Sequence, residues 1–242
     1  MLDIGVVAFT VIAVAVLAGT LVQSVIGLGL GLTAAPIITL LAPELMPGTM
    51  LVLASVFPVM TLARERSEID WHGLAWSMPA RVVGTVVGVV LVAMVGARGL
   101  GIGVSVIVLA AVLLTIRTVV IPITRGTLSG AGFVGGITGT ASSIGGPPFA
   151  LLYQHRPPLQ IRTTMAVYFL IGALLSLGGL ALAGELTRAQ MVTAAALLPV
   201  LLAGALISGP LKRHLRPETV RPAVLVVCAA SAVVLLVRSL LG

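Results

Sequence analysis

Residues Gln23–Pro36 read QSVIGLGLGLTAAP, and residues Gly136–Gln154 read GITGTASSIGGPPFALLYQ. Each stretch interrupts a long apolar run with a cluster of glycines, and each cluster is followed by proline. Glycine and proline can break a membrane helix only where the freed backbone N–H and C=O groups find protein or water. Breaks at matching places in two halves of a chain point to a transporter's binding site near the bilayer midplane. These stretches therefore predict two broken helices around a central site.

The composition predicts a polytopic membrane protein. The chain of 242 residues is 59% hydrophobic and 9% charged, with a mean hydropathy of +1.21, whereas a soluble domain carries about 25% charged residues. Its net charge of +7 comes from arginines at the segment ends, as the positive-inside rule produces, so no nucleic-acid partner is expected. The single cysteine, Cys228, predicts neither a disulfide nor a metal site. The N-terminus lacks a positive n-region, so we expect the first segment to be retained.

Three further apolar runs follow each broken stretch, and most are long enough for the roughly 20 residues that a bilayer requires. The broken stretches occupy 4–43 and 126–154, and the other runs are 48–63, 74–95, 100–121, 163–183, 190–209 and 220–241. The predicted fold class is an all-α polytopic membrane protein, in which each half is a broken or re-entrant helical hairpin plus three transmembrane helices.

The two halves, residues 1–122 and 123–242, align as an internal repeat within one membrane domain. A shift of 116 residues puts Gly29 on Gly145, and a shift of 120 puts Gly84 on Gly204. The small-xxx-small spacing at Gly84 indicates close helix packing.

Charge counting predicts that the broken stretches fold back. Ten basic residues then share one face, which the positive-inside rule makes cytoplasmic: Arg64, Arg66, Arg117, Arg125, Arg156, Arg162, Lys212, Arg213, Arg216 and Arg221. The opposite face has three, Arg98, Arg188 and Arg238. Three crossings per half is an odd number, so the halves have opposite orientations and both termini lie outside.

Each hairpin tip begins a returning half-helix, where free N–H groups and the helix dipole favour an anion. The expected substrate-binding residues at the tips are Gln23, Ser24, Gly27, Gly29, Gly31, Thr140, Ser142, Ser143, Gly145, Gly146 and Pro147. Uncharged donors fit a small oxyanion that must bind and then leave. The alternative is structural: the glycines allow tight helix packing, and the hydroxyls of Thr138, Ser142 and Ser143 bond their own helix.

Arg81 is the only charge well inside an otherwise apolar helix, so it joins the expected binding residues. Snorkelling to the nearby interface is the competing account. None of the six whole helices contains Asp or Glu, which disfavours a buried proton relay, although Glu44 at the outer end of a hairpin stays open. No P-loop is present, and we expect neither a cofactor nor a metal.

The two glycine-rich segments resemble the sulfite exporter TauE/SafE family (DUF81) of bacterial membrane proteins. The matching residues are Gly27, Gly29, Gly31, Pro36, Gly136, Gly139, Gly145, Gly146, Pro147 and Pro148. The resemblance covers nearly the whole chain and implies a transporter of sulfite, sulfonates or related sulfur-containing or organic anions in the bacterial inner membrane. In the first segment Leu28 and Leu30 alternate with glycine instead of a glycine pair, so the second segment should allow closer backbone approach.

Four functions remain open at this point. A secondary carrier for small anions leads, and an anion channel of the same architecture is second. An intramembrane serine hydrolase would use Ser142 or Ser143, but His72, His155 and His214 lie in loops or at segment ends, away from the tips. A structural membrane partner has no need of paired helix breaks. The expected partners are a small anionic substrate and the lipid bilayer, and a homodimer is left open.

Overall fold

The computed structural model describes residues 5–26, 29–116, 121–211 and 217–241, and every regular element in these ranges is helical. The elements are α1 (Val6–Ile26), α2 (Leu30–Leu41), the short 3₁₀ helix η1 (Pro43–Leu45), α3 (Gly48–Arg64), α4 (Trp71–Met94), α5 (Ala97–Ile116), α6 (Arg125–Ser142), α7 (Pro147–Tyr153), α8 (Pro158–Leu182), α9 (Arg188–Leu211) and α10 (Pro217–Leu241). Both expected breaks are confirmed, and three helices follow each broken pair.

The second break has a clear local cause. Ser143 ends α6 in the left-handed conformation, with φ at 61°, and Pro147 and Pro148 follow as the first residues of α7. Proline suits the first helical turn, where its missing N–H costs nothing, and it cannot continue the preceding helix. At the first break α2 begins after Gly29, while residues 27–28 lie outside the described ranges.

Glycines bring α4 and α6 into close contact. A Cβ added at Gly84 would collide with the carbonyl oxygen of Phe133, and one added at Gly132 would collide with that of Ser77. The same arrangement recurs between α9 and α1, where a Cβ at Gly204 would lie 3.1 Å from Thr20. The small-residue spacing at Gly84 therefore acts in helix packing, as expected.

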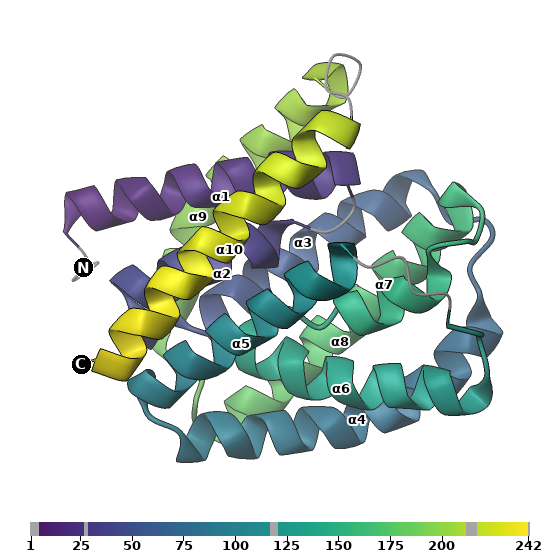
Figure 1. The fold of residues 1–242 in the computed structure, drawn as a ribbon, viewed down its shortest axis with the longest axis horizontal. Coiled ribbons are helices and arrows are strands. Elements are labelled where there is room, and N and C mark those ends of the chain that lie inside the picture. Colours follow the sequence, from purple (N-terminus) through teal and green to yellow (C-terminus); the bar gives the residue numbers. More distant parts are fainter. Residues whose placement is uncertain (1–4, 27–28, 117–120, 212–216, 242) are drawn as a thin grey trace.

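The helices run between two ends of the molecule (Figure 1). The start of α1, the end of α2 and the end of α10 lie at one end, whereas α6 starts and α7 ends at the other. We call these the N-terminal end and the Tyr153 end. The two broken pairs therefore enter from opposite ends, and the long helix pairs α3–α8 and α5–α10 pack between them.

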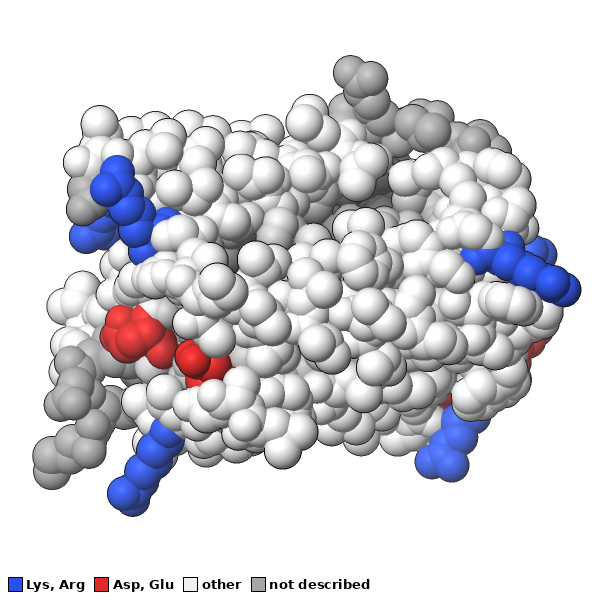
Figure 2. Space-filling model, turned by 90° about the horizontal axis from the view of Figure 1, so that it is seen from below, with Lys and Arg blue, Asp and Glu red and all other residues white. Residues whose placement is uncertain are grey.

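Charged side chains gather at the two ends and leave an uncharged band between them (Figure 2). Five helices in the described residues are long and apolar enough to cross a membrane: α1, α4, α5, α8 and α9. Helix α1, the first helix of the first broken pair, has 21 residues. It is therefore longer than a helix that enters the membrane only halfway, as in a re-entrant hairpin. At 1.5 Å per residue it reaches about 31 Å. The first arm can thus carry its tip past the middle of the molecule.

Candidate functional site

The two helix breaks meet at one cavity of about 50 Å³. Seven of the expected binding residues line it: Gln23, Gly29, Gly31, Ser143, Gly145, Gly146 and Pro147. The approach of the tips is direct, because a Cβ at Gly31 would lie 3.1 Å from Ile144 and from the Ser143 carbonyl oxygen. Residues more than 100 positions apart in the chain thus form one small site.

Gln23 caps the first tip from within the protein. Its Oε1 accepts hydrogen bonds from the N–H of Gly29 at 2.7 Å and from the N–H of Leu30 at 3.2 Å. Two of the four donors that a helix N-terminus leaves unpaired are therefore already satisfied in α2. We expected Gln23 to donate a hydrogen bond to a ligand, but this oxygen accepts hydrogen bonds from the protein's own backbone.

The second tip leaves its backbone donors open. Within the described chain, the N–H groups of Ile144, Gly145 and Gly146 donate no hydrogen bond, and all three residues line the cavity. More than 90% of buried backbone N–H groups find a partner in folded proteins. Three consecutive open donors beside a cavity form the kind of concave N–H cluster that binds anions.

Arg81 lies directly behind the second tip. Its residue is 3% exposed, and its guanidinium carbon is 4.0 Å from the centre of the Tyr168 ring. Its Nη2 is 3.3 Å from the position that a Cβ would take at Gly145, while Nε and Nη1 have no hydrogen-bond partner. The structure therefore places the guanidinium in the interior, where the snorkelling account had put it at the interface.

Gly172 makes room for this buried cation. A Cβ at Gly172 of α8 would collide with three atoms of the Arg81 guanidinium. The Tyr168 ring, one turn earlier on α8, also stacks on Phe149 of α7 at a centroid distance of 4.0 Å. A desolvated cation over an aromatic face gains about 2 kcal/mol or more. Arg81 is thus held in one place by α8, and α7 supports the Tyr168 ring through Phe149.

The other expected residues lie away from the cavity lining or outside the described ranges. Ser142 Oγ donates to the Thr138 carbonyl oxygen at 2.7 Å, and Thr140 Oγ1 bonds the Gly136 carbonyl oxygen and Ser176. Both hydroxyls thus bond carbonyl oxygens of their own helix, as the structural alternative predicts. Ser24 has a buried hydroxyl with no partner, and Gly27 is outside the described residues.

Ser143 joins the second tip to α3, since its Oγ donates to the Pro47 carbonyl oxygen at 3.2 Å. Ser142 and Ser143 thus both bond carbonyl oxygens, and neither bonds a histidine. Of the three histidines, His72 packs on Trp76, His155 is exposed just beyond the end of α7, and His214 lies outside the described residues. The serine-hydrolase alternative finds no base at the tips among the residues that the structure describes.

Apolar side chains complete the cavity. They are Leu30, Leu32, Ala54, Phe57, Pro58, Ile144 and Phe169. The contributions of α3 and α8 are not evident from the sequence, since Phe57 and Phe169 stand in ordinary apolar runs. In α3, Pro58 is a residue whose type could have marked this part of the wall.

The family model described as Sulfite exporter TauE/SafE matches residues 11–235. Neither a comparison with curated proteins nor one with solved structures finds a match. The family match and the helices that can cross a membrane make the chain a multi-pass membrane protein of a transporter family.

Proposed function

The chain belongs to the sulfite exporter TauE/SafE family, and from that premise we propose that it is a secondary carrier for small anions. Its substrate would be sulfite, a sulfonate or a related sulfur-containing or organic anion, moved across the bacterial inner membrane. The anion binds in the cavity between the two helix breaks. The observation that carries this proposal is the row of open N–H groups at Ile144, Gly145 and Gly146.

Charge supports the choice of an anion. The Arg81 guanidinium lies behind Gly145 and the residue is 3% exposed, so its charge acts more strongly than one at the surface. No group of three or more acidic, histidine or cysteine side chains that could hold a metal ion occurs among the described residues. The backbone N–H groups would touch the anion, and Arg81 would lower its electrostatic energy from behind the loop.

The size and lining of the cavity support a small substrate. A volume of about 50 Å³ admits an ion of a few non-hydrogen atoms, since one water needs about 10–15 Å³. Glycine at the tips lets the backbone approach the ion, and the apolar side chains of Phe57 and Phe169 exclude water. Uncharged donors at the point of contact would allow the ion to leave again.

We further propose that residues 1–122 and 123–242 are inverted repeats. In this repeat α1 to α5 correspond in order to α6 to α10, and corresponding helices make corresponding contacts. Helix α4 packs on α6 as α9 packs on α1, and α4 packs on α8 as α9 packs on α3. The two broken pairs enter from opposite ends (Figure 1). Such symmetry gives a carrier two related conformations, one open to each side of the membrane.

The Tyr153 end is the cytoplasmic one in this proposal. Arg64, Arg66, Arg125, Arg156 and Arg162 lie there, while Arg117, Lys212, Arg213 and Arg216 are outside the described residues and the Arg221 side chain is not described. Single cysteines placed beside Arg64 and Arg156 in a Cys228→Ala background should resist impermeant thiol reagents in intact cells. Labelling of both from outside would reverse the orientation.

Transport by purified protein in liposomes tests the function. We expect uptake of radiolabelled sulfite to saturate, and unlabelled sulfite inside to accelerate entry of labelled sulfite by counterflow. A channel would give neither saturation at low concentration nor counterflow. Uptake no faster than in empty liposomes, for sulfite and for a panel of sulfonates, would refute an anion transporter.

A further inference from the structure

Two groups of hydrogen bonds tie the far ends of the returning half-helices to neighbouring long helices. One is centred on Gln190 and the other on Tyr153, and we call them the Gln190 clamp and the Tyr153 clamp. Neither residue lines the cavity. They lie at opposite ends of the molecule. The start of α3 contacts Gln190 through Thr49, whereas the other end of α3 is followed by Glu65, which pairs with Arg162 near the start of α8.

The Gln190 clamp fixes the connection between α2 and α3. Gln190 is 3% exposed, and its Nε2 donates to the carbonyl oxygens of Glu44 and Met46, each at 3.1 Å. Its backbone carbonyl accepts a hydrogen bond from Thr49 Oγ1 at 3.1 Å. Loss of this amide would leave buried carbonyl groups without a hydrogen-bond donor, which destabilises this packing.

The Tyr153 clamp fixes the end of α7. The Tyr153 hydroxyl donates to Asp70 Oδ2 at 2.7 Å, and the backbone N–H of Asp70 donates to Thr164 Oγ1 at 3.0 Å. Burial raises the pKa of Asp70, but the hydrogen bonds from Gly73 and Tyr153, with nearby positive charge, outweigh it and lower the pKa below its usual value. The carboxylate is thus charged, which strengthens the Tyr153 hydrogen bond.

The clamps share one design. In each, a threonine in the first turns of α3 or α8 bonds the start of α9 or α4: Thr49 bonds Gln190, and Thr164 bonds Asp70. In each, a glycine leaves space for the clamping side chain, since a Cβ at Gly48 would collide with Gln190 and one at Gly73 with Tyr153. Gln190 follows Asp70 by 120 residues and Thr164 follows Thr49 by 115, close to the offsets that align the glycine clusters.

We propose that Gln190 and Tyr153 are positioning residues that decide from which end an anion reaches the cavity. Each clamp holds the base of one half-helix, whose other end forms one wall of the cavity. Release of a clamp lets that half-helix withdraw and opens the cavity to its own end of the molecule. With both clamps formed, as here, both half-helices are held against the cavity. The inference rests on the proposed function in that it takes this cavity as the substrate site.

The accessibility of a cavity cysteine tests the clamps. Ala54 lines the cavity from α3, so Ala54→Cys in a Cys228→Ala background is the reporter. An impermeant thiol reagent is applied separately to intact cells and to inside-out vesicles. Gln190→Met removes the amide at similar side-chain length, and Tyr153→Phe removes only the hydroxyl.

Each variant should accelerate labelling from one side only, and the two sides should be opposite. We expect an increase of about fivefold for Tyr153→Phe, the equivalent of about 1 kcal/mol for its one lost hydrogen bond, and a larger increase for Gln190→Met, which loses two. If Gln190→Met fails to insert, Thr49→Val removes a weaker part of the same clamp, and Thr164→Val is its counterpart. Unchanged labelling in the folded variants, or equal increases from both sides, would overturn the proposal.

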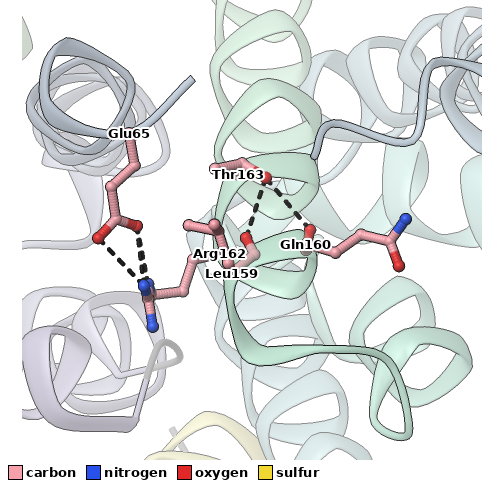
Figure 3. Close-up of polar contacts among 5 residues, drawn as sticks. All are labelled: Glu65, Leu159, Gln160, Arg162 and Thr163. Carbon is pink, nitrogen blue, oxygen red and sulfur yellow. Dashed lines mark hydrogen bonds and ion pairs between the residues drawn. The ribbon is translucent and has the colours of Figure 1, made fainter. Parts of the chain in front are cut away.

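The ion pair between Glu65 and Arg162 supplies the matched control. It joins α3 to α8 with side chains 38% and 52% exposed, at the same end as the Tyr153 clamp, and no half-helix takes part in it (Figure 3). Glu65→Gln should leave labelling unchanged. If the sided labelling is observed but the parent transports no anion, the proposed function fails and the clamps stand. If the parent transports but labelling never responds, the clamps alone fail.

Discussion

The first helix break satisfies its own backbone, whereas the second leaves its backbone open. At the first, Gln23 accepts from Gly29 and Leu30 and a 12-residue helix follows. At the second, the N–H groups of Ile144 and Gly145 have no acceptor in the described chain, and a buried cation lies behind them. Of two similar glycine motifs, one thus has its backbone N–H groups capped by Gln23, and the other has backbone N–H groups without an acceptor in the described chain. We therefore expect the second break to contribute more to anion binding than the first.

The largest effect should come from filling the space at Gly145. A Cβ there would lie 2.5 Å from the Gly135 carbonyl oxygen and 3.0 Å from the Gly139 Cα. Since these are backbone atoms, Gly145→Ala must displace the loop, and we expect sulfite transport to fall about tenfold or more, as overpacking costs about 1–3 kcal/mol. Gly178→Ala on α8, where a Cβ meets open space, should transport like the parent. Parent-like rates for both variants would remove the second break from the site.

Removing the charge behind the second break comes next. Arg81→Met keeps a long side chain without the guanidinium, and we expect the KM for the anion to rise about tenfold, since interactions with a charged group contribute about 1.5–3 kcal/mol. Arg81→Lys should recover part of the loss. If Arg81 only stabilises the C-terminus of α6, both variants should lower the thermal unfolding temperature and leave KM unchanged.

A charge placed at the first break tests whether the two walls share one ligand. Gln23→Glu keeps an oxygen that can accept from Gly29 and Leu30, so the cap and the folded state should persist. The new negative charge lines the cavity, and we expect KM to rise severalfold through repulsion of about 1 kcal/mol. Gln160→Glu makes the same change near the start of α8, where the amide extends away from its neighbours (Figure 3), and should have no effect. A parent-like KM for Gln23→Glu would confine the ligand to the second break.

The smallest effect is expected at Ser142. Its hydroxyl bonds the Thr138 carbonyl oxygen of its own helix and does not line the cavity. Anion binding by Ser142→Ala should therefore equal that of the parent, measured by competition against labelled sulfite. A loss of about 0.5–1.5 kcal/mol would show that the hydroxyl donates to the ligand after all.

The sequence predicted the helix breaks well because their cause is local. Glycines and Pro147 act on the backbone of their own segment, so the ends of α6 and α7 could be placed within a few residues. The alternation of Leu28 and Leu30 with glycine predicts closer backbone approach at the second segment, and this stays a prediction. The roles of Gln23, Arg81 and Gln190 could not be read in this way, since their contacts lie on other segments or across a break.

A polytopic helical membrane protein with two broken helices could be predicted from the sequence, because apolar length and glycine or proline breaks are properties of short segments. The packing of the helices, by contrast, brings both breaks to one cavity, places Phe57 and Phe169 in its wall and buries Arg81 behind Gly145. These contacts depend on which helix faces meet. Close packing of α4 on α6, and of α3 on α8, sets those faces, and 30 residues of chain separate even the nearer pair, α4 and α6.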